Sequence, residues 1–165
     1  MLKRLWQRIN PFHKTIKIIY NGAKIERHGN CYDIALPCDF KPEYRHYTST
    51  IGFNEIDLGI QTTLPKHYRA VLNFRSSTPK RYGYINASGF GEIEWDYSGR
   101  WVGTIASASS SIGMAFKGDR LFQFHIEPLW DAPWYVKVCH LFAKFSFVEV
   151  EELTTTRGGL GSTGK

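Results

Sequence analysis

Apolar and polar residues alternate over short runs along most of the chain, and turn residues separate the runs. This alternation is typical of β-strands with one buried face. Clusters of Gly, Pro, Asn and Ser interrupt it, as at Asn21-Gly22 and Ser77-Thr78-Pro79. The predicted strands are Thr15–Tyr20, Tyr32–Leu36, Ile56–Thr62, Tyr68–Phe74, Tyr82–Asn86, Arg100–Ala106, Leu121–Ile126 and Phe145–Val150. Many short strands at this spacing predict one all-β domain, a sandwich or jelly roll.

Three segments depart from this pattern. Residues 1–14 place Leu2, Leu5, Trp6 and Ile9 at helical spacing among basic residues, which predicts an N-terminal amphipathic arm. The arm fits a surface-seeking helix for a membrane or nucleic acid, but we favour docking on its own or a neighbouring subunit. Residues 129–144 fit a strand pair, a short helix or an insertion equally well. Residues 154–165 form a glycine-rich polar tail, so the β domain is expected over 15–153.

Composition narrows the function classes. The 165 residues include 42% apolar ones, enough for a core, and no apolar run approaches a membrane span. Charges interrupt any signal-peptide core near the start. The three cysteines have no CxxC pair, which favours a reducing, cytoplasmic setting. The net charge of +6 lies mainly in residues 1–48, so it indicates a basic N-terminal segment rather than a nucleic-acid-binding face.

The stretch from Gly91 to Gly99 contains several candidate catalytic and binding residues close together. It places the acids Glu94 and Asp96 and the ring of Tyr97 between two glycines, beside predicted strands. An acid at such an edge can orient a water, and the ring can pack on a sugar. The alternative interpretation is a charged turn followed by a core tyrosine, and Asp96 is an alternative to Glu94 as the water-holding acid.

Other catalytic patterns are absent from the sequence. Gly159 to Lys165 match the spacing of a phosphate loop, but no Ser or Thr follows the lysine. Pro37-Cys38 lacks the second cysteine of a zinc deaminase, and the six histidines do not cluster. No local signature of a serine–histidine–acid triad is present.

Five blocks in order resemble the homotrimeric dUTP pyrophosphatase family, from about Lys24 to Lys165. Each block alone is a weak signal, but five in the family's order are a specific one. The blocks are Asn30-Cys31-Tyr32-Asp33-Ile34 (family A-G-x-D-L), Leu64-Pro65 with Tyr68 leading to Arg75-Ser76-Ser77 (L-P-x-G-Y to P-R-S-G), Gly91 to Gly99 (G-x-I-D-x-D-Y-x-G), Gly118 to Gln123 (G-x-R-I-A-Q), and Val148 to Leu153 followed by Arg157-Gly158 and Gly159 to Gly164.

The resemblance implies a distorted jelly roll of the β-clip type, a homotrimer with shared sites, and Mg²⁺-dependent hydrolysis of dUTP to dUMP and pyrophosphate. Glu94 is expected to hold the attacking water and Tyr97 to pack on the deoxyribose. Asp33 is expected to act on the metal through water. The remaining expected site residues contact the phosphates or the uracil, or belong to the tail that closes over the nucleotide. They are Arg75, Ser76, Ser77, Gln123, Arg120, Asn86, Gly91, Ile93, Arg157, Leu160, Gly161, Ser162 and Thr163. Arg120 alternatively pairs with Asp119 or a neighbouring subunit.

The sequence also departs from the family pattern. Glu94 replaces an aspartate and so extends the carboxylate by about 1 Å, a displacement that can cost about a hundredfold in rate. Leu160 replaces a base-stacking phenylalanine, and the fifth block is shorter around Arg157, where Thr155 or Thr156 is an alternative. Cys31 and Ser77 replace glycines and Phe74 replaces a proline, which bears on backbone geometry.

Four functions remain open at this stage. The first is dUTP hydrolysis, which limits uracil in DNA and supplies dUMP, by a viral or phage enzyme in the host cytoplasm. The second is a same-fold dCTP deaminase or dCTP-cleaving enzyme. The third is a nucleotide-binding regulatory protein that has lost turnover. The fourth, a basic nucleic-acid-binding protein, rests on pI alone, and we expect neither a membrane partner nor stable nucleic-acid binding.

Overall fold

Two five-stranded sheets form the domain. The computed structural model describes residues 12–42, 53–107 and 113–153, and it has the expected all-β architecture. One sheet has the order β10-β1-β4-β8-β6 and the other β2-β3-β9-β5-β7. Only β1 and β10 run parallel among the pairs of described strands. The first sheet contains β1 (His13–Tyr20), β4 (Phe53–Thr63), β6 (Tyr84–Asn86), β8 (Arg100–Ser107) and β10 (Lys144–Glu149), and the second β2 (Lys24–His28), β3 (Cys31–Ala35), β5 (Tyr68–Phe74), β7 (Gly91–Glu94) and β9 (Arg120–Pro128).

The core lies between the sheets. Trp101 of β8 and Phe124 of β9 are almost fully buried, with ring centroids 4.9 Å apart in an edge-on arrangement. Gly103 allows the closest approach, because a Cβ there would lie 2.3 Å from the Phe122 ring. A glycine at this place in β8 therefore lets the second sheet pack against the first.

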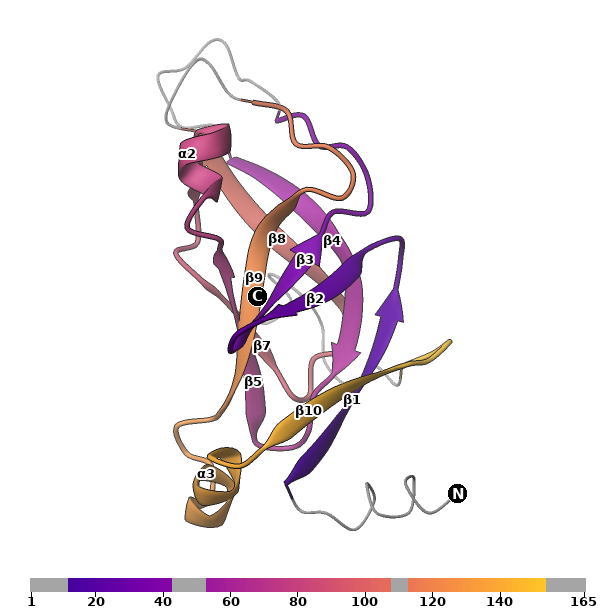
Figure 1. Cartoon of the computed structure of the whole chain (residues 1–165), viewed down its shortest axis with the longest axis vertical. Coiled ribbons are helices and arrows are strands. Elements are labelled where there is room, and N and C mark those ends of the chain that lie inside the picture. Colours follow the sequence, from indigo (N-terminus) through magenta and orange to yellow (C-terminus); the bar gives the residue numbers. More distant parts are fainter. Residues whose placement is uncertain (1–11, 43–52, 108–112, 154–165) are drawn as a thin grey trace, which may run out of the picture.

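In the part of the chain that the structure describes, two short helices lie at opposite ends, as Figure 1 shows: α2 (Thr78–Tyr82) and α3 (Trp134–His140). In α2, Pro79 lies in the first turn and Gly83 ends the helix with φ 72°. The prediction that Tyr82 begins a strand is therefore wrong, since β6 starts at Tyr84. For residues 129–144, the short-helix alternative is confirmed.

The other predicted strands are present with shifts of a few residues at their ends. The strand β2 was not predicted, because all but one of its five residues are exposed and no apolar period marks it. No helix in the described ranges is long and apolar enough to cross a membrane. Cys31, Cys38 and Cys139 are all free thiols.

Candidate active site

Asp33, Gln123 and Asn73 form one row across three neighbouring strands. Asp33 of β3 pairs with Gln123 of β9, which in turn pairs with Asn73 of β5. Tyr32 and Ile34 on either side of Asp33 belong to the core, so Asp33 lies on the opposite face of the sheet. Residues of the first, second and fourth blocks are thus brought together.

Three basic groups surround the Asp33 carboxylate, which is only 1% exposed. Arg75 Nε lies 3.0 Å from Asp33 Oδ2, and groups of Arg120 and His28 each lie 3.8 Å from the same oxygen. These are ion-pair distances without hydrogen-bond orientation, and neither Asp33 oxygen accepts a hydrogen bond from a described residue. A buried carboxylate with free lone pairs beside cationic side chains is suited to binding water or a polar ligand.

The backbone of Arg75 is fixed to the start of β9. Its N–H donates to Leu121 O at 2.9 Å, and its own carbonyl accepts from Thr78 N at the same distance. The Thr78 hydroxyl, fully buried, also donates to Leu121 O at 2.7 Å. Ser76 and Ser77 lie between these anchors and are exposed. Arg75 and the serines are therefore presented on a rigid turn next to Gln123.

Arg120 contacts a different acid from the one expected. Its Nη1 lies 2.5 Å from Glu26 Oε2 and 3.1 Å from His28 Nε2, both on β2. Asp119 instead accepts from Phe116 N at 2.8 Å and lies 3.5 Å from Arg81. The alternative of an Arg120–Asp119 pair is therefore wrong, and Arg120 lies at the margin of the Asp33 cluster.

The second group of expected residues lies on β7, the edge strand of the same sheet. Glu94 pairs with Arg69 of β5, and Gly91 pairs with Leu72. Ile93 is 7% exposed and packs into the core. Since Ile93 and Glu94 alternate, the Glu94 side chain lies on the same outer face as Asp33.

Tyr97 folds back over Gly99 in the loop after β7. A Cβ on Gly99 would lie 2.5 Å from the Tyr97 hydroxyl oxygen, which donates to Arg100 O at 2.8 Å. Burial of the ring raises the pKa of Tyr97, so the phenol stays neutral. The glycine is required because only its bare Cα leaves room for the ring.

Asn86 ends β6 in the other sheet. Its amide donates to Gly89 O at 2.7 Å, and Ser88 Oγ lies 3.2 Å from Asn86 Oδ1. Because β6 pairs with β8 and β7 with β5, residues 86–93 cross from one sheet to the other and do not join two paired strands. The crossing leaves the edge of β7 beside an exposed polar turn.

Glu94 and Asp33 do not meet within one chain. Asp33 is in register with Asn73 of β5, and Glu94 is in register with Arg69, four residues away along that strand. Since β3 and β7 are also three strand spacings apart, the Cα atoms of Asp33 and Glu94 lie about 20 Å apart. A carboxylate side chain cannot span such a distance. The expected residues therefore fall into two groups, one around Asp33, Arg75 and Gln123 and one around Glu94 and Tyr97.

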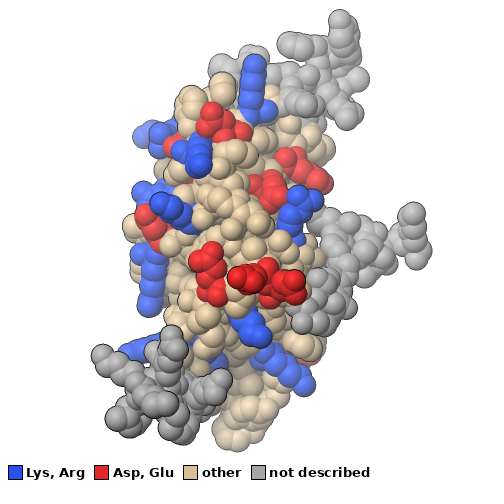
Figure 2. Space-filling model, turned by 90° about the vertical axis from the view of Figure 1, so that its right-hand side faces the viewer, with Lys and Arg blue, Asp and Glu red and all other residues tan. Residues whose placement is uncertain are grey.

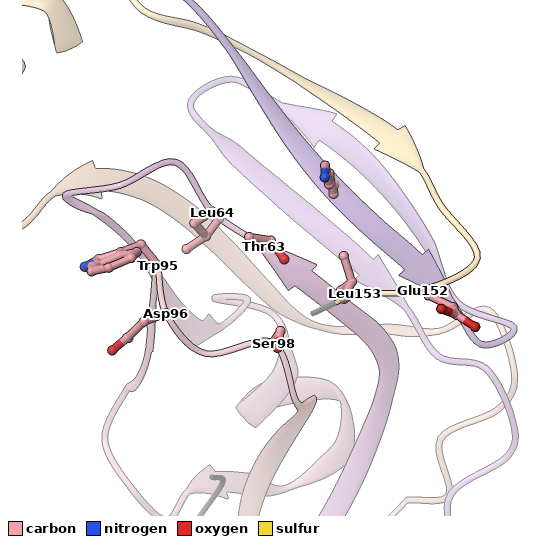
Figure 3. Close-up of a pocket in the computed structure, with 8 residues that line it drawn as sticks. Thr63, Leu64, Trp95, Asp96, Ser98, Glu152 and Leu153 are labelled. Atoms are coloured by element: carbon pink, nitrogen blue, oxygen red, sulfur yellow. The ribbon is translucent and has the colours of Figure 1, made fainter. Parts of the chain in front are cut away.

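A cavity of about 230 Å³ lies beside the second group. Figure 3 shows it between the loop after β7, the middle of β1, the end of β4 and the segment after β10. Its lining consists of Lys17, Thr63, Leu64, Trp95, Asp96, Ser98, Glu152 and Leu153. Asp96 thus lines this cavity, whereas Glu94 lies on the sheet.

The chain leaves the described structure at this cavity, because Leu153 is the last described residue of the domain. The expected tail residues Arg157, Leu160, Gly161, Ser162 and Thr163, with the alternatives Thr155 and Thr156, lie outside the described ranges.

Sequence reasoning missed an ion network on the same outer face. Arg69 lies 2.6 Å from Glu92 and 2.7 Å from Glu127, and His125 lies 3.4 Å from Glu127. Burial by itself raises the pKa of Glu127, but the contacts with Arg69 and His125 outweigh it and lower the pKa below its ordinary value. The network depends on which residues of β5, β7 and β9 lie opposite one another, and the sequence does not reveal this register.

A divalent cation has no dedicated cage here: no group of three His, Cys, Asp or Glu among the described residues is arranged to hold one. Asp33 supplies one carboxylate whose oxygens accept no hydrogen bond from a described residue, and its neighbours Arg75, Arg120 and His28 are basic. Mg²⁺ commonly keeps several waters and uses one or two carboxylates plus substrate phosphates. The donor set therefore fits a hydrated ion brought in with phosphates.

Comparison with known proteins identifies a relative. No protein-family model matches the chain. It is 32% identical over 117 residues to the SPbeta prophage-derived deoxyuridine 5'-triphosphate nucleotidohydrolase YosS of Bacillus subtilis (strain 168), covering 68% of this chain and 72% of that protein.

Solved dUTPases share the fold. The Streptococcus mutans enzyme superposes with a TM-score of 0.60 at 17% identity, over 72% of this chain and 98% of that one. The dUTPase from phage phi11 of S. aureus gives a TM-score of 0.56 at 18% identity, over 72% and 92%. The Staphylococcus bacteriophage 80alpha dUTPase gives 0.53 at 16%, over 85% and 98%. On its sequence similarity and its fold, the chain belongs to the deoxyuridine 5'-triphosphate nucleotidohydrolase (dUTPase) family.

Proposed function

We propose that the protein hydrolyses dUTP to dUMP and pyrophosphate. The observation that supports this most strongly is the convergence of Asp33, Arg75 and Gln123 from three separate sequence blocks on one sheet face. Cleaving a phosphoanhydride requires positioning and neutralisation of charge more than covalent help. A fixed guanidinium, exposed serines and an amide beside a buried carboxylate supply those parts.

In this proposal the Asp33 group binds the triphosphate. Arg75 presents N–H groups to phosphate oxygens, with Ser76, Ser77 and Gln123 as further donors. The buried Asp33 keeps the guanidinium in place and orients waters of the metal. Arg120, held by Glu26 and His28, adds positive charge at the edge of the group.

The Glu94 group receives the nucleoside and the attacking water. Glu94 accepts a hydrogen bond from that water and aligns it with the innermost phosphorus. The Tyr97 ring, fixed over Gly99, packs on the deoxyribose and leaves no room for a 2′-hydroxyl. Backbone groups between Asn86 and Ile93, Gly91 among them, read the uracil edge.

We infer further that each site is shared between copies of the chain, in a homotrimer. The estimated 20 Å between the two groups separates the water-holding acid from the phosphate donors within one copy. A neighbouring copy that offers its β7 edge to the Asp33 face completes the site. The tail residues Arg157, Leu160, Gly161, Ser162 and Thr163 then close over the nucleotide.

Magnesium is the proposed cofactor. When bound with the triphosphate it neutralises negative charge and polarises the phosphoryl oxygens. Asp33 is the residue that would hold it, through water. The relative is prophage-derived, so we propose a viral role for this protein, in the host cytoplasm. We propose neither a membrane partner nor stable nucleic-acid binding.

A second candidate is nucleotide binding without turnover. The longer Glu94 side chain, in place of the family's aspartate, favours it, since a carboxylate displaced by about 1 Å can lower the rate about a hundredfold.

The test is release of pyrophosphate and ammonia from dUTP, dCTP, dTTP and UTP with magnesium. Pyrophosphate from dUTP in clear preference to the others is the expected result. Glu94→Gln should lower it at least about a hundredfold, with the oligomer intact by sedimentation. The matched control is Glu92→Gln, on the same strand and face, which should keep most activity. Ammonia from dCTP would establish the deaminase instead, and binding of dUTP without product would establish the regulatory protein.

A further inference from the structure

The helix α3 exposes an apolar face. Trp134 and Val138 of α3 and its C-cap residue Leu141 follow one another at helical spacing and are 76%, 49% and 76% exposed. Tyr135 and Phe142 extend this face, at 53% and 63% exposed. Exposed apolar groups of this size on one surface indicate that something covers them. We call these five residues the α3 face.

The opposite side of α3 holds it on the domain. Val136 is its one buried residue, and the His140 ring lies 5.7 Å from that of Tyr68 in the core. Figure 2 shows the lower end of the molecule, where α3 lies in Figure 1, as a mostly uncharged surface. The α3 face is therefore largely exposed, whereas the opposite side of the helix contacts the core.

The chain enters the described structure against this face. The Phe12 ring packs edge-on against Phe142, with centroids 5.7 Å apart. Phe12 O accepts a hydrogen bond from Lys144 N at 2.8 Å, which fixes the entry point just after α3. Residues 1–11 precede Phe12 and lie outside the described ranges. Whatever they form is tethered at the edge of the α3 face.

The sequence of this segment matches the face. Leu2, Leu5, Trp6 and Ile9 recur at helical spacing, with Lys3, Arg4 and Arg8 between them. Asn10-Pro11 ends such a helix and leaves a short link to Phe12. A helix of residues 2–9 is about 12 Å long, comparable to α3 with its seven residues.

We propose that residues 2–9 form an amphipathic helix that docks its apolar stripe on the α3 face of the same chain. The short link gives the segment an effective concentration in the millimolar range for its own face. Lys137 and Lys144 on the α3 side are cationic, as the arm is, so charge does not drive the docking. Salt screens such exposed charges, and burial of the apolar stripe decides the position.

Hydrogen exchange of the intact protein tests the contact. The amides of residues 134–143 should exchange at least about fivefold faster in a Leu5→Ser, Trp6→Ser double variant, which loses the stripe. The matched control is Arg4→Ser with Arg8→Ser, which alters the charged face and should leave the exchange rates unchanged. Equal exchange in both variants would overturn the proposal. Hydrolysis of dUTP, unaffected in both, reports that the domain is folded.

Lysine cross-linking identifies the occupant. A short amine-reactive reagent should join Lys3 to Lys137 or Lys144. In a refolded mixture of ¹⁴N and ¹⁵N protein, docking in the same chain gives only light–light and heavy–heavy products. Mixed light–heavy products would place the arm on a neighbouring copy and overturn the proposal. Slow hydrogen exchange of α3 that appears only when anionic phospholipid vesicles are added would make the face a membrane contact, which also overturns it.

Discussion

The Nε atom of Arg75 lies 3.0 Å from the buried Oδ2 of Asp33, across two strand spacings of the second sheet. Asp33 is 1% exposed, whereas the Arg75 side chain is 30% exposed. The carboxylate of this pair is therefore buried, and its guanidinium is partly exposed to solvent. It fixes the inner edge of the guanidinium and leaves the outer N–H groups for a ligand.

The first prediction follows from this asymmetry. Arg75→Gln should lower the stability by about 1–3 kcal/mol, because the buried Asp33 loses its nearest cation. Arg75→Lys keeps the charge but loses the planar fork, so it should fold normally and raise the KM for dUTP at least about tenfold. Thermal unfolding and steady-state rates measure the two effects.

Arg81→Gln is the matched control for Arg75. Its side chain is 67% exposed and lies 3.5 Å from Asp119, so its loss should change stability by less than about 0.5 kcal/mol. A KM in Arg75→Lys equal to that of the parent would remove Arg75 from the phosphate site.

A second prediction concerns Gly99 and the sugar. A methyl group at position 99 would lie only 2.5 Å from the Tyr97 hydroxyl oxygen, closer than van der Waals contact allows. Gly99→Ala should therefore displace the ring and weaken discrimination between dUTP and UTP by about tenfold or more. The ratio of kcat/KM values for the two nucleotides measures it, and an unchanged ratio would mean that Tyr97 does not contact the sugar.

A third prediction concerns Gly103 and the core. The Phe122 ring occupies the space of a Cβ at position 103, so Gly103→Ala should destabilise the fold by about 1–3 kcal/mol. Gly113→Ala is the control, since its nearest atom lies 3.6 Å away. Denaturant midpoints compare the two, and equal midpoints would contradict the close packing of the sheets.

A fourth prediction concerns pH. The folded-state pKa of Glu127 lies below its ordinary value of 4.5, so its ion pair stabilises the fold above that pH and is lost as pH falls through the folded pKa. Glu127→Gln should remove about 0.5–1 kcal/mol at neutral pH. Stability against pH should then fall less steeply below about pH 5 in the variant. Parallel curves for the two proteins would show that the pair contributes nothing.

Like Glu127, His140 makes the fold less stable as the pH falls. Burial of the ring lowers the pKa of His140 below 6.5, so the folded state favours the neutral ring. Its contribution is present above pH 6.5 and is lost as pH falls. Because the Glu127 charge raises the pKa of His140 and so partly offsets this lowering, Glu127→Gln also changes the His140 contribution, and the comparison has to be made on a background that lacks His140.

Elements with a local signal could be predicted from the sequence. The strands β5, β8 and β9 contain dense apolar residues and were predicted within one or two residues of their ends. Pro79 and Gly83 mark α2 clearly in hindsight, since a proline in the first turn and a glycine at the end are helix signals. The aromatic and β-branched residues around them favoured a strand instead.

Elements that depend on tertiary contacts could not be predicted. The helix α3 contains Trp134, Tyr135 and Val136, which favour strands locally, and its position depends on packing of Val136. The Arg69–Glu127 pair joins residues 58 positions apart through strand register. The family blocks predicted Asp33, Arg75 and Gln123 as site residues, and the structure brings these three together, but the separation of Glu94 from them emerges only from the sheet order.

The central claim is that one site combines the Asp33 group of one copy with the Glu94 group of another. Asp33→Asn and Glu94→Gln chains, each inactive alone, are co-expressed with different tags, and the mixed oligomers are purified on both tags. Their pyrophosphate release from dUTP is then measured. In a trimer that contains both chain types, one of the three sites pairs an intact Asp33 with an intact Glu94, which is about one third of the sites. We predict recovery of about that share of the parental rate, whereas mixed oligomers as inactive as the single variants would contradict the claim.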